Sequence, residues 1–392
     1  MSEIKVNSIK GVGASTAAIT VNNTDGTCTA NITNNLSNRN KIYNGKIDID
    51  QRNSGSAVTL ANNILTYPVD RFSAQPVNMD EATNMTGQQV DDAPDGFAHS
   101  LKITTNTAES SIASNEFVSV YQIMEGQDFQ DLAYNTSGAK NVIMSFYVKS
   151  SITGTFGCGI YRNESTQRII NKTYTINSAN TWERKTIIIE GDTSSAITND
   201  NANRWWNMWH LASGTNYNYI TSSSWADYAT GNWAGGHAQN GVVTTAGATW
   251  QITGVQLEVD HTGSGKPTDF EHINYSTELK RCERYCETIL LGETDGAYLA
   301  TACAYTTNQM YAIFRFRTPK RATNPTLYHT TGTNYYRMYR DGNNVSATGF
   351  TGTSWPNKHA TAVYNSMTIT AGQSGLLGSD NANAKLLFTS EL

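Results

Sequence analysis

The sequence predicts an all-β protein: a jelly-roll β-sandwich followed by a smaller C-terminal β-sandwich, with an N-terminal β-arm. Three observations predict this fold class. Apolar and polar residues alternate along many short segments, and in Val142–Ser150 one face would carry Val142, Met144, Phe146 and Val148. Clusters of Asn, Ser, Thr and Gly separate these segments, as turns separate strands. Only 16% of the 392 residues are charged, while 20 are Tyr and 8 are Trp. This length is enough for two or three domains.

Residues 1–40 are predicted to form an arm. Short alternating segments occur around Ile4 and Val6, at 18–21 and at 27–33, and Asp25-Gly26 between the last two is typical of a turn. Such strands are too short to bury a core, so they need partners, either copies of the chain or another protein. A disordered terminus is the alternative, but β-branched residues and few charges favour the arm.

Residues 41–288 are predicted to form the jelly-roll domain, with a connector helix at its end. Eight or more strands follow one another at 97–104, 117–124, 142–150, 157–163, 168–176, 182–190, 204–211 and 250–258. In the last strand the alternation of apolar and polar residues shifts by one residue at Gly254, which predicts a β-bulge or a close backbone approach there. The helix is expected at 276–288, capped by Ser276, with one apolar face formed by Leu279, Cys282, Tyr285 and Cys286.

Residues 289–392 are predicted to form a second, smaller β-domain. Strands are expected at 311–316 and 362–369. Asp341-Gly342-Asn343 is typical of a hairpin turn. The segment 385–392 has an apolar centre and is expected to pair into a sheet as the last strand.

Composition excludes several classes of protein. The net charge is -5 and no Lys/Arg cluster is present, so no nucleic-acid partner is expected. The sequence contains no run of 18 apolar residues, so membrane insertion is not expected. Residues 1–6 lack the apolar core of a secretory signal. Cys282 and Cys286 would lie one helical turn apart, but an odd number of scattered cysteines indicates buried or free thiols rather than a zinc site. Neither a metal nor a cofactor is expected.

No catalytic pattern stands out. The 33 acidic residues are scattered, and neither a phosphate loop, a Ser-His-Asp signature nor an HExxH helix occurs. The sequence therefore predicts that the protein is not an enzyme. A glycan-degrading enzyme is the alternative, and it would need two acids paired in a cleft.

Aromatic residues gather between Trp205 and Trp233. Rings can stack on the C–H faces of sugars, and Asn, Ser and Thr can supply hydrogen bonds. The residues predicted to contact a glycan are Trp225, Trp233, Tyr228 and Trp206. Packing within the fold is the alternative. On a strand, Trp205 and Trp209 would share one face, and Trp206 and His210 the other, so at least one pair would belong to the core.

An ordered set of segments resembles a family of bacteriophage tail-fibre and virion structural proteins from phages of marine bacteria and cyanobacteria. The matching segments are 38–47, 51–52, 67–72, 100–103, 144–151, 180–183, 188–193, 250–258, 267–272 and 281–285. The resemblance covers residues 38–290, and the arm also looks like the start of that group. It implies a jelly roll similar to carbohydrate-binding modules, mounted on a phage particle and usually trimeric. From Arg204 onward the chain is more aromatic than the family pattern, and the loop running on to Gly241 is long.

These observations together predict a subunit of a phage tail fibre or spike, made and assembled in the bacterial host cytoplasm. The arm would attach a homotrimer to tail or adaptor proteins, and the β-domains would recognise a host cell-surface glycan. The alternative is a purely structural tail adaptor or decoration protein that contacts virion proteins alone. Exposed aromatic residues at the distal tip would favour receptor binding, and covered ones the structural role.

Overall fold

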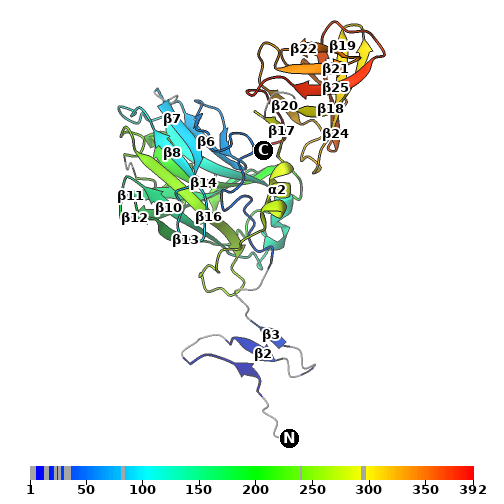
Figure 1. The fold of residues 1–392 in the computed structure, drawn as a ribbon. Coiled ribbons are helices and arrows are strands. Elements are labelled where there is room, and N and C mark those ends of the chain that lie inside the picture. Colours follow the sequence, from blue (N-terminus) through cyan, green and yellow to red (C-terminus); the bar gives the residue numbers. More distant parts are fainter. Residues whose placement is uncertain are drawn as a thin grey trace.

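The computed structural model describes residues 6–12, 17–21, 24, 28–30, 37–80, 84–238, 241–292 and 297–392. In these residues the chain is all-β, as predicted, and all paired strands are antiparallel. Three parts follow one another: a small N-terminal sheet, a large sandwich (the central sandwich) and a smaller sandwich (the C-terminal sandwich). Strands β2 (Ile19–Val21) and β3 (Cys28–Ala30) lie at one end of the central sandwich, and the C-terminal sandwich lies toward the other (Figure 1).

The central sandwich is a jelly roll of two sheets. The six-stranded sheet B has the order β13 (Glu183–Ile189), β10 (Val142–Ser150), β16 (Thr249–Val259), β8 (Ser100–Thr105), β7 (Met85–Val90) and β4 (Val58–Thr59). The seven-stranded sheet C has the order β15 (Ala226–Asp227), β12 (Arg168–Ile176), β11 (Gly154–Arg162), β14 (Asn203–Ser213), β9 (Phe117–Glu125), β6 (Phe72–Val77) and β5 (Thr66–Val69). The 3₁₀ helix η2 (Gly126–Leu132) follows β9.

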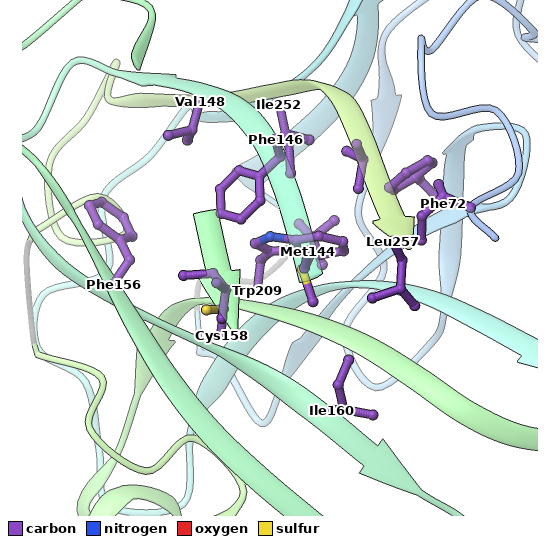
Figure 2. Packing of buried hydrophobic residues seen from close by; sticks show 14 of the residues in the cluster. Phe72, Met144, Phe146, Val148, Phe156, Cys158, Ile160, Trp209, Ile252 and Leu257 are labelled. Carbon is purple, nitrogen blue, oxygen red and sulfur yellow. The ribbon is translucent and has the colours of Figure 1, made fainter. Parts of the chain in front are cut away.

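The main core lies between sheets B and C. The predicted inward face of β10 is confirmed, because Val142, Met144, Phe146 and Val148 are all fully buried there. In Figure 2 Met144 and Phe146 lie beside Trp209 of β14 in the opposite sheet, and the ring centroids of Phe146 and Trp209 are 5.9 Å apart. Burying a large apolar side chain contributes roughly 1.5–3 kcal/mol, so this alternation fixes which face of each strand points inward.

The predicted irregularity at Gly254 is confirmed as a β-bulge. Ser145 of β10 pairs with Gln256 of β16, whereas Tyr147 pairs with Thr253, so one residue of β10 faces two of β16. Gly254 has φ +60°, and a Cβ there would lie 2.7 Å from the ring of Phe97. Only glycine accepts this combination without strain, and the extra residue keeps both halves of β16 facing the core.

The predicted connector helix is present, but its predicted bounds are wrong. Helix α2 spans Tyr275–Glu283 and its N-cap is Asn274 rather than Ser276. Cys286 already belongs to strand β17 (Cys286–Leu291), so Cys282 and Cys286 do not share a helix, although both are buried free thiols. Pairing with β26 (Lys385–Thr389) supplies β17 with backbone partners that outweigh its local helical periodicity. The predicted domain boundary at 288/289 falls inside β17.

The C-terminal sandwich has a hydrophobic core of its own. The prediction that residues 289–392 form a separate domain requires such a core. Sheet D has the order β17, β26 (Lys385–Thr389) and β20 (Thr326–His329). Sheet E has the order β22 (Asn343–Ala347), β21 (Tyr336–Arg340), β25 (Ser374–Ser379), β18 (Tyr298–Thr306), β19 (Gln309–Arg315), β24 (Ala360–Ser366) and β23 (Gly352–Ser354). The predicted hairpin is confirmed: Asp341 and Gly342 join β21 to β22, both with positive φ. The predicted last strand is β26.

Buried charges join the two sandwiches. Arg71, whose side chain is 1% exposed, forms an ion pair with Glu391. Arg52 bonds to the same carboxylate at 2.8 Å and approaches Asp70 at 3.4 Å. The Arg71 guanidinium also lies 3.4 Å from the ring centroid of Tyr285. Burying a charge costs free energy unless an opposite charge lies beside it. Arg52 and Arg71 of the central sandwich therefore need Glu391 of the C-terminal sandwich as a counter-ion.

The N-terminal sheet consists of β1 (Ser8–Ile9), β2 (Ile19–Val21) and β3 (Cys28–Ala30), with β2 in the middle. Ile9 is 53% exposed, whereas Ile19 and Val21 are half-buried, so this sheet buries its apolar residues only in part. The predicted turn at Asp25-Gly26 lies outside the described residues. Asn40 belongs to the central sandwich, because its side chain bonds to the backbone of Val255 and Leu257. No helix in the described ranges is long and apolar enough to cross a membrane.

Candidate functional site

A second aromatic cluster lies on the outer face of sheet C, away from the main core. Strand alternation produces it: Trp205 and Trp209 of β14 point into the core, whereas Trp206 and Met208 point outward. We call the rings gathered there the outer aromatic cluster: Tyr121, Tyr161, Trp206, Tyr228 and Trp233. The expectation that at least one pair of strand tryptophans would be core is confirmed, because Trp205 and Trp209 are both fully buried.

Trp233 lies at the centre of the cluster. Its ring centroid is 5.3 Å from that of Tyr161, 5.9 Å from Tyr228 and 6.2 Å from Trp206. Most of these pairs are edge-to-face, a geometry that adds about 0.5–1.5 kcal/mol per pair beyond area burial. Trp233 therefore organises the cluster, while its own side chain remains only partly exposed.

The loop that carries Trp233 and Tyr228 is held by asparagines. The side chain of Asn171 on β12 donates to the carbonyl of Asn232 at 2.9 Å and accepts from the backbone of Ser222 at 3.0 Å. The side chain of Asn232 donates to the hydroxyl of Ser222 at 3.1 Å and to the carbonyl of Asp227. These bonds fix a segment whose Ser, Gly and Asn content gives it no core of its own. The segment also contains α1 (Thr215–Asn218) and η3 (Thr230–Asn232).

Three of the four residues predicted to contact a glycan come together, and the fourth does not. Trp206, Tyr228 and Trp233 share the outer aromatic cluster, and each is partly exposed. Trp225 instead packs against the main core, with its ring 6.3 Å from Trp205. Its indole N–H donates to the carbonyl of Glu190 at 2.6 Å, so that donor is already used.

Two buried histidines lie beneath the loop. His210 Nδ1 is 2.8 Å from the hydroxyl of Ser119, and His237 Nδ1 accepts from the backbone N–H of Gly157 at 3.1 Å. Burial lowers the pKa of His210 to about 3 and that of His237 to about 4. Both are therefore neutral at neutral pH. His210 contacts the cluster, with its ring 6.5 Å from that of Trp233, and His237 in turn contacts His210.

One group of acids in the described residues could hold a metal ion. The carboxylate oxygens of Asp80, Glu109 and Glu116 lie within 4.8 Å of one another, and both glutamates are buried. Burial, with the nearby charges of Glu109 and Asp80, raises the pKa of Glu116. Hard oxygen ligands of this kind suit Ca²⁺ or Mg²⁺. Sequence analysis did not single out these three acids, because they form no spacing motif along the chain.

The C-terminal sandwich exposes aromatic and apolar side chains that sequence reasoning did not single out. Trp355 is 90% exposed and has φ +52°, a conformation that bulky residues rarely adopt. The outer face of sheet E carries Tyr298, Tyr305, Ile313 and Leu376, exposed by 43–72%.

Comparisons with known proteins found similarity to solved structures only. No protein-family model and no curated protein matches the chain. The enzymatically active domain of tailspike protein 4 of bacteriophage CBA120 is 11% identical over 56% of this chain, which spans 21% of that structure, with a TM-score of 0.29. A family 11 carbohydrate-binding module from Clostridium thermocellum, in complex with a β-1,3-1,4-mixed-linked tetrasaccharide, is 9% identical over 55% of this chain and 98% of its own, with a TM-score of 0.25.

The xylan-binding CBM22-1 domain from Paenibacillus barcinonensis Xyn10C is 11% identical over 48% of this chain and 85% of its own, also with a TM-score of 0.25. The chain is thus similar to structures that include a phage tailspike and carbohydrate-binding modules. Likeness at this level says nothing of what the chain binds, and the resemblance to phage tail proteins stays a hypothesis.

Proposed function

We propose that this chain is a non-enzymatic subunit of a bacteriophage tail fibre or spike, and that it forms a homotrimer. Its N-terminal sheet attaches to tail or adaptor proteins, and the two sandwiches recognise a glycan on the host surface. The position of the N-terminal strands at the end of the central sandwich away from the C-terminal sandwich supports this division of labour (Figure 1). The phage assignment rests on the ordered sequence resemblance over residues 38–290.

The outer aromatic cluster is the observation that carries glycan recognition. Trp206 and Tyr228 are partly exposed on its rim, and the central Trp233 fixes their orientation through ring contacts. Rigid rings held from below offer flat apolar surfaces at little cost in conformational entropy. The C–H face of a sugar ring suits such a surface, and the exposed carboxylate of Asp227, next to Tyr228 in the chain, can accept hydrogen bonds from sugar hydroxyls.

Replacing Trp206 with alanine is expected to weaken binding to host cells by about 1–3 kcal/mol, by analogy with aromatic stacking on nucleic-acid bases. Tyr228→Ala should act in the same direction, because both rings lie on the rim. Adsorption of the purified protein to host cells, with its melting temperature measured in parallel, tests this. Trp206→Phe keeps an aromatic ring and should recover part of the affinity.

Trp355→Ala is the matched control, because it removes an exposed tryptophan from the other sandwich. The cluster is not the glycan site if Trp206→Ala and Tyr228→Ala adsorb like the unmodified protein. Loss of adsorption in Trp355→Ala alone would move the contact to the C-terminal sandwich.

Deleting residues 1–36 is expected to leave the rest folded while abolishing incorporation into phage particles. The deletion stops before residue 37 because Asn38 and Asn40 bond to Glu271 of the central sandwich. Circular dichroism should give an unchanged melting temperature, and light scattering of the full chain should give the mass of a trimer. Truncated protein that still enters virions, or a full chain that is monomeric at micromolar concentration, contradicts this attachment role.

The alternative is a tail adaptor or decoration protein that contacts virion proteins alone. The exposed face of sheet E favours it, because Tyr298, Tyr305, Ile313 and Leu376 form an apolar surface that another protein could cover. An image of the intact particle distinguishes the two functions. A chain covered on all sides by virion proteins supports the adaptor, and free sandwiches at a tip support host recognition.

A further inference from the structure

A pocket of about 550 Å³ lies where the two sandwiches meet. We call it the junction pocket. The central sandwich contributes Arg52 and Tyr67, and the C-terminal sandwich contributes Arg321, Tyr328, Lys385 and Glu391. Its volume lies in the range of about 300–1,000 Å³ that is usual for small-molecule sites. None of its lining residues belongs to the outer aromatic cluster.

The junction pocket has more positive than negative charge. Glu391 pairs with Arg71 and Arg52, and Arg52 also approaches Asp70, so these two arginines and two acids balance. Arg321 is different: its guanidinium donates to the backbone carbonyls of Ser390, Asn201 and Glu391, which are neutral acceptors.

Lys385 is the second unbalanced cation. Its backbone pairs with Thr330, but within the described ranges its ammonium group forms no ion pair with an acid. The side chain is partly exposed and lines the pocket. Arg321 and Lys385 thus give the pocket a surplus of two positive charges, which favours an anionic ligand.

The walls of the pocket suit a sugar better than a bare anion. Tyr328 is 52% exposed on β20, and Tyr67 stands on β5 with the Arg52 guanidinium 4.8 Å from its ring centroid. Asn53, Asn324 and Thr326 add amide and hydroxyl groups to the same lining. Aromatic faces together with amides and hydroxyls match the C–H faces and hydroxyls of a pyranose.

We propose that the junction pocket binds an acidic sugar, a hexuronic acid or another carboxylate-bearing pyranose, at the end of or within a glycan. The carboxylate pairs with Lys385 and meets the positive field of Arg321, and the ring lies against Tyr328. This inference goes beyond the proposed function, because it holds whether the chain meets the sugar on a host cell or elsewhere.

Isothermal titration calorimetry of the full chain tests the pocket with two matched disaccharides. One ends in glucuronic acid, and the other is its carboxyl-reduced counterpart ending in glucose. The acidic disaccharide is expected to bind at least tenfold more tightly, because a charge-assisted hydrogen bond contributes more than a neutral one. Equal affinity for the two disaccharides overturns the proposal. Succinate or inorganic phosphate binding as tightly as the acidic disaccharide also overturns it, since the site would then be a simple anion site.

Two variants locate the binding. Lys385→Gln should weaken binding of the acidic disaccharide roughly tenfold and leave the neutral one unchanged. Tyr328→Ala should weaken both. The matched controls are Lys140→Gln and Tyr305→Ala, which change an exposed lysine and an exposed strand tyrosine outside the pocket. Unchanged affinity in both pocket variants, or equal losses in the controls, overturns the assignment.

Failure here is distinguishable from failure of the proposed function. Trp206→Ala lies in the outer aromatic cluster, so it should leave binding of the soluble acidic disaccharide unchanged. Lys385→Gln should conversely leave unchanged any adsorption to host cells that depends on Trp206.

Discussion

Replacing Glu391 with glutamine is expected to lower the free energy of unfolding by about 3–5 kcal/mol. The carboxylate pairs with Arg71, whose side chain is 1% exposed, and bonds to Arg52 at 2.8 Å. The amide removes the negative charge and leaves a buried arginine without a counter-ion. The remaining contacts of Arg71, with the carbonyl of Ile123 and the ring of Tyr285, do not neutralise it.

Denaturant unfolding followed by tryptophan fluorescence measures this effect. Glu190→Gln is the matched control, because Glu190 also forms an ion pair, with Lys172, but its side chain is 52% exposed. An exposed pair contributes about 0–1 kcal/mol, so the control should hardly change stability. If Glu391→Gln costs no more than the control, the two sandwiches do not depend on this carboxylate.

As the pH falls from 6.5 to 4.5, His210 and His237 are each expected to contribute a loss of stability. Burial lowers the pKa of His237 to about 4 and that of His210 to about 3, whereas an unfolded histidine titrates near pH ~6.5. Below that pH the unfolded chain binds protons that the folded chain does not. The contribution to stability is therefore complete above about pH 6.5 and is lost as the pH falls toward the folded values, by up to about 1.4 kcal/mol per pH unit for each histidine.

His237→Asn isolates one of the two contributions. The asparagine carbonyl can accept the bond that the Gly157 N–H donates at 3.1 Å, but it does not titrate. The free energy of unfolding should therefore change less steeply with pH in the variant. The difference corresponds to about one bound proton, or ~1.4 kcal/mol per pH unit. His359→Asn, at an exposed position, should keep the original slope. Equal slopes in the His237 variant and the unmodified protein would mean that this histidine is charged when folded.

Strand alternation and turn chemistry made much of the fold predictable. The inward face of β10, the bulge at Gly254 and the hairpin at Asp341-Gly342 depend on local backbone preference and on the period of two residues, which can be read from sequence. The end of α2 was not predictable in this way. Cys286 continues the helical period of apolar residues, and only pairing with the distant strand β26 makes residues 286–288 a strand.

The candidate sites were less predictable, because they depend on contacts between distant segments. Alternation on β14 correctly separated Trp206 from Trp205. It could not show that Trp225 packs on the core while Trp233 joins the outer aromatic cluster, since both stand in a loop without a period. The junction pocket combines Tyr67 with Tyr328 and Lys385, which meet only after both sandwiches have formed. The acids Asp80, Glu109 and Glu116 were missed for the same reason.

The pairing of β17 with β26 has a consequence for synthesis on the ribosome. The strand that opens the C-terminal sandwich finds its neighbour only near the end of the described chain, and Glu391 follows shortly after β26. A nascent chain that stops before Lys385 therefore carries a central sandwich with an uncompensated Arg71 and a C-terminal sandwich with an open sheet edge. Proteases and chaperones recognise such exposed, loosely held chains. The junction would then distinguish chains that contain β26 and Glu391 from chains that lack them.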